Sequence, residues 1–488
     1  MSNKPLREVL CIYPYQVELQ KWTAFPPIGL EYIATVTRDF AERVYVIDCR
    51  GGEDYRDFIT PRTELVLISW NWPLEHDFVS GVIRSIPARI TTIVGGRYAT
   101  QFIDDIFADF PNVDMVVRGE GEEAMREYLA RGNPRGVANM SYREDGKVVH
   151  NEPIAIKHVA DEALDRSLRR MTYNIRAMNT DLGIKIDSIS TSRGCPFNCK
   201  FCTFSLGPYG VKRPWAARSP ESVVDELAEI RAPIVGIVDD NPTVNMNRVE
   251  EICDLILERG INKRYVFNAR IDIYRRPALL RKMRRAGFFM ACIGIESTTD
   301  ELLKGITKGF TVKKLKEAWK ILRKIDFHYH GYFMLGLLGE TLEDKMRIAP
   351  FAQELGVDTM GIQILRLEQH SPIAQQVEET PGYFVDENGY IISDEFPIRR
   401  MRKIRREISR RFYTPGQMWR IASKLWRAEI LSNVGFLAGL GKFAGITFCK
   451  NLVAMLKPGK RLTHAQKKQA EAQAKAAAEK EKQILSAK

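Results

Sequence analysis

Three cysteines lie close together near the middle of the 488-residue chain: Cys195, Cys199 and Cys202, in the spacing Cys-x₃-Cys-x₂-Cys. They directly follow an apolar, strand-like run at 184–190. Three thiolates on one short loop can bind three irons of a [4Fe–4S] cluster and leave the fourth iron without a protein ligand. An iron with an open position is a place where a small molecule can bind and react.

A zinc ion is the alternative occupant of this loop. Structural zinc takes four ligands, commonly in Cys-x-x-Cys pairs, and the nearest further candidate, Cys253, lies far along the chain in an apparent helix. The triplet therefore favours the cluster. The other cysteines are scattered singly, which indicates a reducing compartment, and the first residues do not resemble a signal peptide. We expect a cytoplasmic protein.

The triplet, with Phe201 before its last cysteine, resembles the signature of the radical S-adenosylmethionine (SAM) superfamily. The resemblance implies that the amino and carboxylate groups of SAM chelate the open iron. It also implies that an electron from the cluster cleaves SAM to a 5′-deoxyadenosyl radical, which takes hydrogen from an unactivated carbon. A flavodoxin- or ferredoxin-type protein would supply that electron.

Further segments resemble those that hold SAM in this family. Asp240 and Asn241 belong to an Asp-Asp-Asn-Pro-Thr element, for which an Asx turn is the alternative. Arg270 could grip a carboxylate or form a structural Arg–Asp pair. Glu296, in a Gly-x-Glu-Ser segment, would bind the ribose hydroxyls. Glu340 lies in a turn where leucine replaces the usual proline, and it could instead cap the next helix. No general acid or base is assigned.

Residues 184–370 alternate strand and helix patterns. Six strand-like runs with helices between them predict a partial (β/α)₆ barrel, in which chemistry lies at the carboxyl ends of the strands. The predicted strands are 184–190, 234–238, 265–269, 289–295, 330–335 and 359–365.

The first 150 residues form a separate α/β unit, joined to the barrel by a linker at 151–183. Short β-branched runs alternate with helical spacing, as in a doubly wound, Rossmann-like parallel sheet. The predicted strands are 9–13, 44–48, 65–70, 91–94 and 114–117, and the predicted helices are 29–39, 75–85 and 100–109.

Turns containing Gly95, Gly96, Gly119 and Glu120 resemble the cobalamin-binding domain found in many radical SAM enzymes. Glycine at such turns lets the backbone approach a large flat ligand beyond the strand ends. The family's Asp-x-His-x-x-Gly loop is replaced at 13–18 by Tyr-Pro-Tyr-Gln-Val-Glu, which has no histidine. The domain either binds cobalamin without a histidine ligand or only positions substrate.

The net charge of +12 comes from the C-terminal region, because residues 398–488 carry 22 Lys and Arg against 5 Asp and Glu. Basicity far from the active site argues against a nucleic-acid partner. Residues 371–462 are predicted to be helical, and 463–488 to be a charged tail. This region would either lie on an anionic membrane, peripherally, or cap the barrel.

The arrangement resembles the subclass of the anaerobic magnesium-protoporphyrin monomethyl ester cyclase and the bacteriochlorophyll and hopanoid methylases. The resemblance implies cobalamin-dependent radical C-methylation of a hydrophobic small molecule, such as a tetrapyrrole or an isoprenoid lipid. Radical oxidation or cyclisation without methyl transfer is the alternative. A tRNA methylthiolase and a non-enzymatic membrane scaffold are more distant alternatives.

Overall fold

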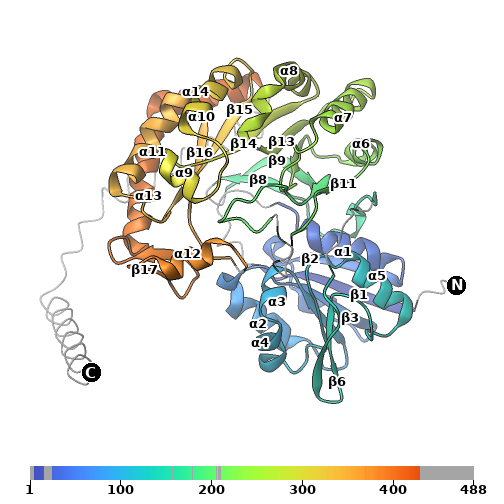
Figure 1. Cartoon of the computed structure of the whole chain (residues 1–488). Helices are drawn as coiled ribbons and strands as arrows, with labels where there is room; N and C mark the ends of the chain where they lie inside the picture. Colours follow the sequence, from blue (N-terminus) through green and yellow to red (C-terminus); the bar gives the residue numbers. More distant parts are fainter. Residues whose placement is uncertain are drawn as a thin grey trace, which may run out of the picture.

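The computed structural model of the chain describes residues 5–428, apart from 16–24, 155–158, 160, 178–179, 205, 207–209, 211 and 369. The expectations for the chain beyond 428, including the charged tail, lie outside these residues. Two seven-stranded sheets, one in each half of the described chain, form its framework (Figure 1).

The first sheet has the strand order β2-β1-β3-β4-β5-β6-β7, with β1 to β5 parallel. This confirms the doubly wound prediction. The strands are β1 (Leu6–Tyr13), β2 (Ala41–Asp48), β3 (Thr63–Ser69), β4 (Thr91–Gly95), β5 (Met115–Val117), β6 (Met140–Glu144) and β7 (Lys147–His150). The antiparallel pair β6–β7 was not expected.

Both faces of this sheet are covered by helices, as continuous apolar strands require. Helices α1 (Ile28–Arg38) and α5 (Glu122–Arg131) cover one face, and α2 (His76–Ser85), α3 (Arg97–Gln101) and α4 (Ile103–Asp109) cover the other (Figure 1). Apolar side chains of these helices form the two cores on either side of the sheet. The helix predicted at 100–109 is in fact two helices, because the backbone leaves the helical conformation at Phe102.

The second sheet has the order β16-β15-β14-β13-β12-β9-β8 and confirms the partial barrel. Six of its strands are parallel: β9 (Thr180–Ile189), β12 (Ile234–Ile237), β13 (Arg264–Ala269), β14 (Phe288–Glu296), β15 (His328–Leu335) and β16 (Thr359–Ile364). The short strand β8 (Asn174–Ala177) pairs antiparallel with β9, within the predicted linker.

The barrel's outer surface packs on a row of helices that includes α6 (Pro220–Glu229), α7 (Met246–Glu258), α8 (Pro277–Arg285), α10 (Val312–Leu322) and α11 (Leu342–Leu355). Strand residues such as Phe267, Ile293 and Phe333 form this core. The alternate residues of the strands face the barrel interior, since side chains alternate along a strand.

The region after the barrel was predicted to be helical, but it also contains a β-hairpin. It comprises α12 (Ile373–Glu379), the hairpin β17 (Tyr383–Val385) and β18 (Ile391–Ser393), α13 (Ile398–Phe412) and α14 (Pro415–Arg427). The apolar side chains of α13, including Met401 and Ile408, belong to the barrel core. This face of α13 therefore caps the barrel and is not open to a membrane. Within the described part of the chain, no helix is long and apolar enough to cross a bilayer.

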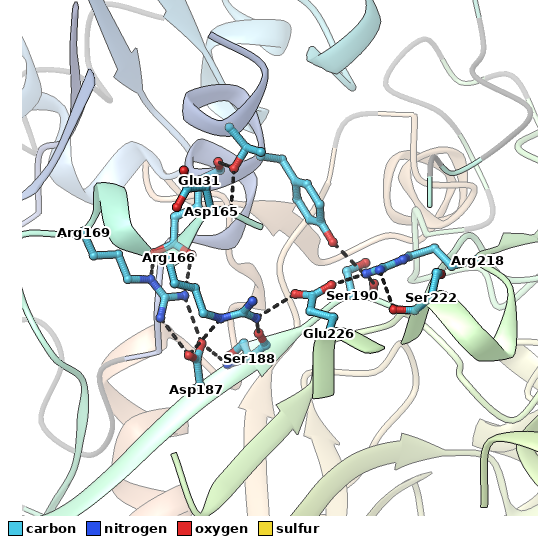
Figure 2. A network of polar contacts seen from close by, with 12 residues as sticks. Glu31, Asp165, Arg166, Arg169, Asp187, Ser188, Ser190, Arg218, Ser222 and Glu226 are labelled. Atoms are coloured by element: carbon cyan, nitrogen blue, oxygen red, sulfur yellow. Dashed lines mark hydrogen bonds and ion pairs between the residues drawn. The ribbon is translucent and has the colours of Figure 1, made fainter. Parts of the chain in front are cut away.

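A buried ion-pair network joins the two halves of the molecule (Figure 2). Arg169 in the linker binds Glu31 of α1 (Nη2–Oε2, 2.6 Å) and Asp187 of β9 (Nη1–Oδ2, 2.8 Å). Arg166 also binds Asp187, and it reaches Glu226 of α6. Burial alone would raise the pKa of Asp187, but the two arginines hold that pKa below its ordinary value. The linker thus fixes the first sheet against the barrel.

Candidate active site

The cysteine loop begins just beyond the first parallel strand of the barrel. Asp239 and Asp240, which follow β12, anchor the start of this loop: Asp239 accepts hydrogen bonds from Thr191 and Ser192, and the Asp240 Oδ2 accepts one from the Gly194 N–H (2.7 Å). Parallel strands bring their carboxyl ends to one edge, so two distant parts of the sequence meet here.

The side chains of the loop suit a cluster. Cys199 is buried and the other two cysteines are half-buried. The pKa of Cys202 is raised to about 12 because the thiol is buried and lies beside the sulfurs of Cys199 and Cys195. Bound metal would supply the positive charge that such thiolates need.

No three His, Cys, Asp or Glu side chains among the described residues converge tightly enough to hold a single metal ion. A cubane cluster does not require this convergence, because each cysteine binds its own iron. The loop therefore fits the cluster by its donor set and spacing.

Glu296 and Arg270 lie beside this loop. The Glu296 Oε1 is 2.7 Å from the Lys308 Nζ, and both side chains are buried. Arg270 donates to the Lys308 carbonyl (2.7 Å), and its Nη1 is 3.6 Å from the Cys199 Sγ. Its guanidinium also stacks over the Phe197 ring at 3.7 Å. The two predicted SAM-binding side chains are thus brought together next to a predicted iron ligand.

The backbone around Glu296 is built to present its carboxylate. Glu296 has a φ of +68°, which is uncommon for a residue with a side chain. A Cβ added at Gly294 would lie 2.3 Å from the Glu296 Oε1 and 2.7 Å from the Lys308 Nζ. Glycine at 294 is therefore required by the position of the acid.

The remaining predicted residues on the barrel side have mixed roles. The Asn241 Oδ1 accepts hydrogen bonds from the Thr243 N–H and hydroxyl, so the Asx-turn alternative is observed. Glu340 accepts a hydrogen bond from the Gly336 N–H of its own turn (2.7 Å) and pairs with Lys345 of α11 (3.2 Å). Thr341 caps the next helix, so the capping alternative for Glu340 is wrong. Contact of Asn241 or Glu340 with SAM stays a prediction.

A cavity of about 720 Å³ lies between the two halves of the molecule. Its wall on the first-sheet side includes all four residues predicted there, Gly95, Gly96, Gly119 and Glu120, and its wall on the barrel side includes Thr203, Phe204, Leu206, Val238 and Asp240. It therefore opens between the cysteine loop and the carboxyl edge of the first sheet, where doubly wound folds bind ligands.

Gly96 shapes the sheet side of this cavity. Its φ is +109°, and an added Cβ would lie 2.6 Å from the Trp70 carbonyl oxygen. A side chain there would either clash or push the backbone into the cavity. Gly96 is therefore required by the approach of its backbone to Trp70, and an approach of this backbone to a bound ligand stays a prediction.

Charged residues close the cavity on one side. Glu120 pairs with Arg193 (Nη1–Oε1, 3.3 Å) and with Arg213, and Arg193 also pairs with Glu122. Arg97 reaches from α3 to the Thr203 hydroxyl in the cysteine-loop region. The sequence interpretation did not assign any of these arginines to the site. Arg97 could have been found, because it directly follows the Gly-Gly turn, but no local signal marks Arg213.

In a comparison with known protein families, residues 189–352 match the model of the radical SAM superfamily. The chain is 28% identical to an uncharacterized methyltransferase of Pyrococcus horikoshii, covering 73% of this chain and 79% of that one. It is 28% identical to the anaerobic magnesium-protoporphyrin IX monomethyl ester cyclase of Cereibacter sphaeroides (53% and 44% covered) and 26% identical to the hopanoid C-3 methylase of Methylococcus capsulatus (65% and 62%). It spans less than two thirds of the latter two proteins.

Two solved structures share the whole architecture. The methyltransferase TsrM of Kitasatospora setae, with cobalamin and a [4Fe–4S] cluster bound, aligns with a TM-score of 0.62 at 19% identity, covering 84% of this chain and 82% of that one. OxsB with aqua-cobalamin and SAM bound aligns with a TM-score of 0.63 at 18% identity, covering 80% and 64%. The cysteine loop, the barrel and these matches agree: the chain belongs to the radical SAM superfamily of enzymes and has the fold of its cobalamin-dependent members.

Proposed function

We propose that this enzyme transfers a methyl group to an unactivated carbon of a hydrophobic substrate, with a [4Fe–4S] cluster, SAM and cobalamin as cofactors. The observation that carries the proposal is the cavity, which touches the glycine turns of the first sheet and the residues next to the cysteine loop. A ligand filling it would lie beside the site where SAM is expected.

The residues on the sheet side fit cobalamin. Gly95, Gly96 and Gly119 leave backbone exposed to the cavity, and Tyr13 lines it at the end of β1. Among the described lining residues, His370 on the barrel side is the one histidine, and the sequence has none at 13–24. Binding would therefore proceed without a histidine from the loop after β1. When bound, cobalamin supplies a methyl group to a carbon-centred radical.

On the barrel side, the three cysteines would hold the cluster, which supplies the electron that cleaves SAM. Glu296 would accept hydrogen bonds from the ribose hydroxyls, since a carboxylate can bind two of them. Lys308, whose Nζ is 2.7 Å from the Glu296 Oε1, would hold that carboxylate in one orientation. Arg270, held by the Lys308 carbonyl and 3.5 Å from the Asp272 carboxylate, would bind the carboxylate of SAM.

The substrate class is supported by the relatives and by the cavity. The relatives include methylases of hopanoids and cyclases of a magnesium porphyrin. Much of the cavity wall is apolar, including Ile33, Val117, Phe204, Leu206 and Val238. We therefore propose an isoprenoid lipid or a tetrapyrrole, with a flavodoxin- or ferredoxin-type protein as the reductant.

The test uses the full chain, purified without oxygen and supplied with iron, sulfide and cobalamin. It is incubated with reductant, SAM carrying a labelled methyl group, and a lipid or tetrapyrrole extract. Methyl transfer predicts both 5′-deoxyadenosine and S-adenosylhomocysteine, with label in the organic phase. Formation of 5′-deoxyadenosine alone would instead establish oxidation or cyclisation without methyl transfer, the alternative that the cyclase relatives favour.

A further inference from the structure

Helix α14 turns its polar side toward the protein. Gln417 donates to the backbone carbonyls of Val357 (3.0 Å) and Asp358 (2.5 Å). Lys424 donates to the Phe327 carbonyl (2.9 Å) and pairs with the buried Asp358 carboxylate (2.7 Å). These bonds fix α14 against the amino-terminal end of the barrel by polar contacts.

The opposite side of α14 is apolar and exposed. Trp419 is 77% exposed and Trp426 is 58% exposed, and these residues lie two turns apart on one face. Met418, next to them, is 52% exposed. Trp419 is more exposed than any other large apolar side chain in the described part of the chain. A surface helix ordinarily places its large apolar side chains on the core. In α14, Leu425 does so, but both tryptophans point away from the protein.

The preceding helix adds positive charge. Arg399, Arg402 and Arg406 recur at helical spacing on the side of α13 opposite to its buried apolar residues, and all three are exposed. Among residues 5–428 as described, no carboxylate pairs with any of these three. An exposed row of unpaired arginines attracts a surface of negative charge.

We propose that the outer faces of α13 and α14 bind the surface of an anionic lipid bilayer. Tryptophans settle at the interface between headgroups and acyl chains, while arginines contact lipid phosphates. The sequence that follows α14 fits the same occupant, because residues 434–448 are mostly apolar with Lys442 as their one charge. This proposal is independent of the reaction that the enzyme catalyses.

The test measures sedimentation of the full chain with vesicles of phosphatidylcholine, alone or mixed equally with phosphatidylglycerol. We expect binding to the mixed vesicles only, weakening as salt rises. Both W419S/W426S and R399E/R402E/R406E should weaken this binding about tenfold or more. The control R56E/R62E/R135E reverses exposed arginines of the first domain and should bind as the wild type does.

A second measurement places the tryptophans themselves. Brominated phosphatidylglycerol should quench the fluorescence of the wild type, and W419F/W426F, which keeps aromatic rings at both positions, should lose most of that quenching. Failure of the wild type to bind mixed vesicles would overturn the proposal. Unchanged binding of W419S/W426S would also overturn it, because the contact would then be made by residues beyond 428. A wild-type dimer that W419S/W426S disrupts would overturn it as well, because the face would then bind a second copy of the chain.

Discussion

The two walls of the central cavity are built by different means. On the first-sheet side the wall combines apolar side chains such as Ile33 with the turn glycines Gly96 and Gly119, which adopt positive φ and present backbone. On the barrel side the adjoining site consists of buried charged side chains, with Glu296 paired to Lys308. Backbone at glycine turns can lie close against a broad, flat ligand. Buried charged side chains can instead bind a small ionic ligand in one orientation. The difference predicts that the two walls can be disabled separately.

The largest effect is expected from the cysteine loop. C199A should abolish the cluster absorbance of the anaerobically reconstituted protein and lower SAM cleavage by about a thousandfold or more, because one iron loses its protein ligand. C253A is the matched control, since Cys253 is buried among the helices of the barrel core. Equal cluster content in C199A and the wild type would contradict the assignment.

The next effect concerns the network that holds the two walls together. R169M leaves Glu31 and Asp187 without their shared partner and should lower the free energy of unfolding by about 3–5 kcal/mol. R170M removes an exposed pair with Glu53 and should cost less than about 1 kcal/mol. Chemical denaturation measures both variants, and similar losses would show that the buried network does not fix the domains.

A smaller and more selective effect is expected from the glycine wall. G96A should weaken cobalamin binding about 10- to 100-fold, because the new methyl group meets the Trp70 carbonyl and the backbone is strained at positive φ. G29A alters another glycine of the same cavity wall, where an added Cβ meets no atom within 4 Å, and should bind normally. Cluster content and SAM cleavage should stay unchanged in both variants. Loss of the cluster in G96A would contradict the prediction that the two sides of the cavity can be altered independently.

The corresponding substitution on the barrel side is E296Q. It should weaken SAM binding about 10- to 100-fold, because a charged hydrogen-bond acceptor is replaced by a neutral group of the same size. Cobalamin binding should be retained, which equilibrium titration with each ligand can establish. The control E301Q changes an exposed acid of α9 (Asp300–Gly305). If E296Q binds SAM as tightly as the wild type does, Glu296 does not contribute to SAM binding.

Much of this architecture could be predicted from the sequence, because buried parallel strands have continuous apolar runs and short turns of characteristic residues. The strands from 9–13 to 359–365 and the cysteine loop are of this kind. The pair β6–β7 was missed because both strands are short and rich in polar residues, although the first three residues of β6 are buried. Glu296 was identified by its motif, but its partner Lys308 carries no local signal.

Contacts between distant segments were beyond the reach of sequence patterns. Arg169 binds Glu31 across 138 positions, and nothing in the linker's composition distinguishes it from Arg170. Similarly, Trp419 and Trp426 are seven positions apart and must share one side of a helix, but the sequence does not tell which side of that helix meets the protein. The answer depends on the carbonyls of Val357 and Asp358, which become available only after the barrel has formed.

The linker's arginines also limit how this enzyme can be divided or recombined. A fragment ending near residue 150 would take Arg169 away from Glu31. A barrel begun near 184 would take Arg166 and Arg169 away from Asp187, whereas Glu226 would keep only Arg218. Chimeras with relatives should therefore exchange 151–183 together with both acidic surfaces. A neutral spacer of equal length would join the halves without setting their spacing.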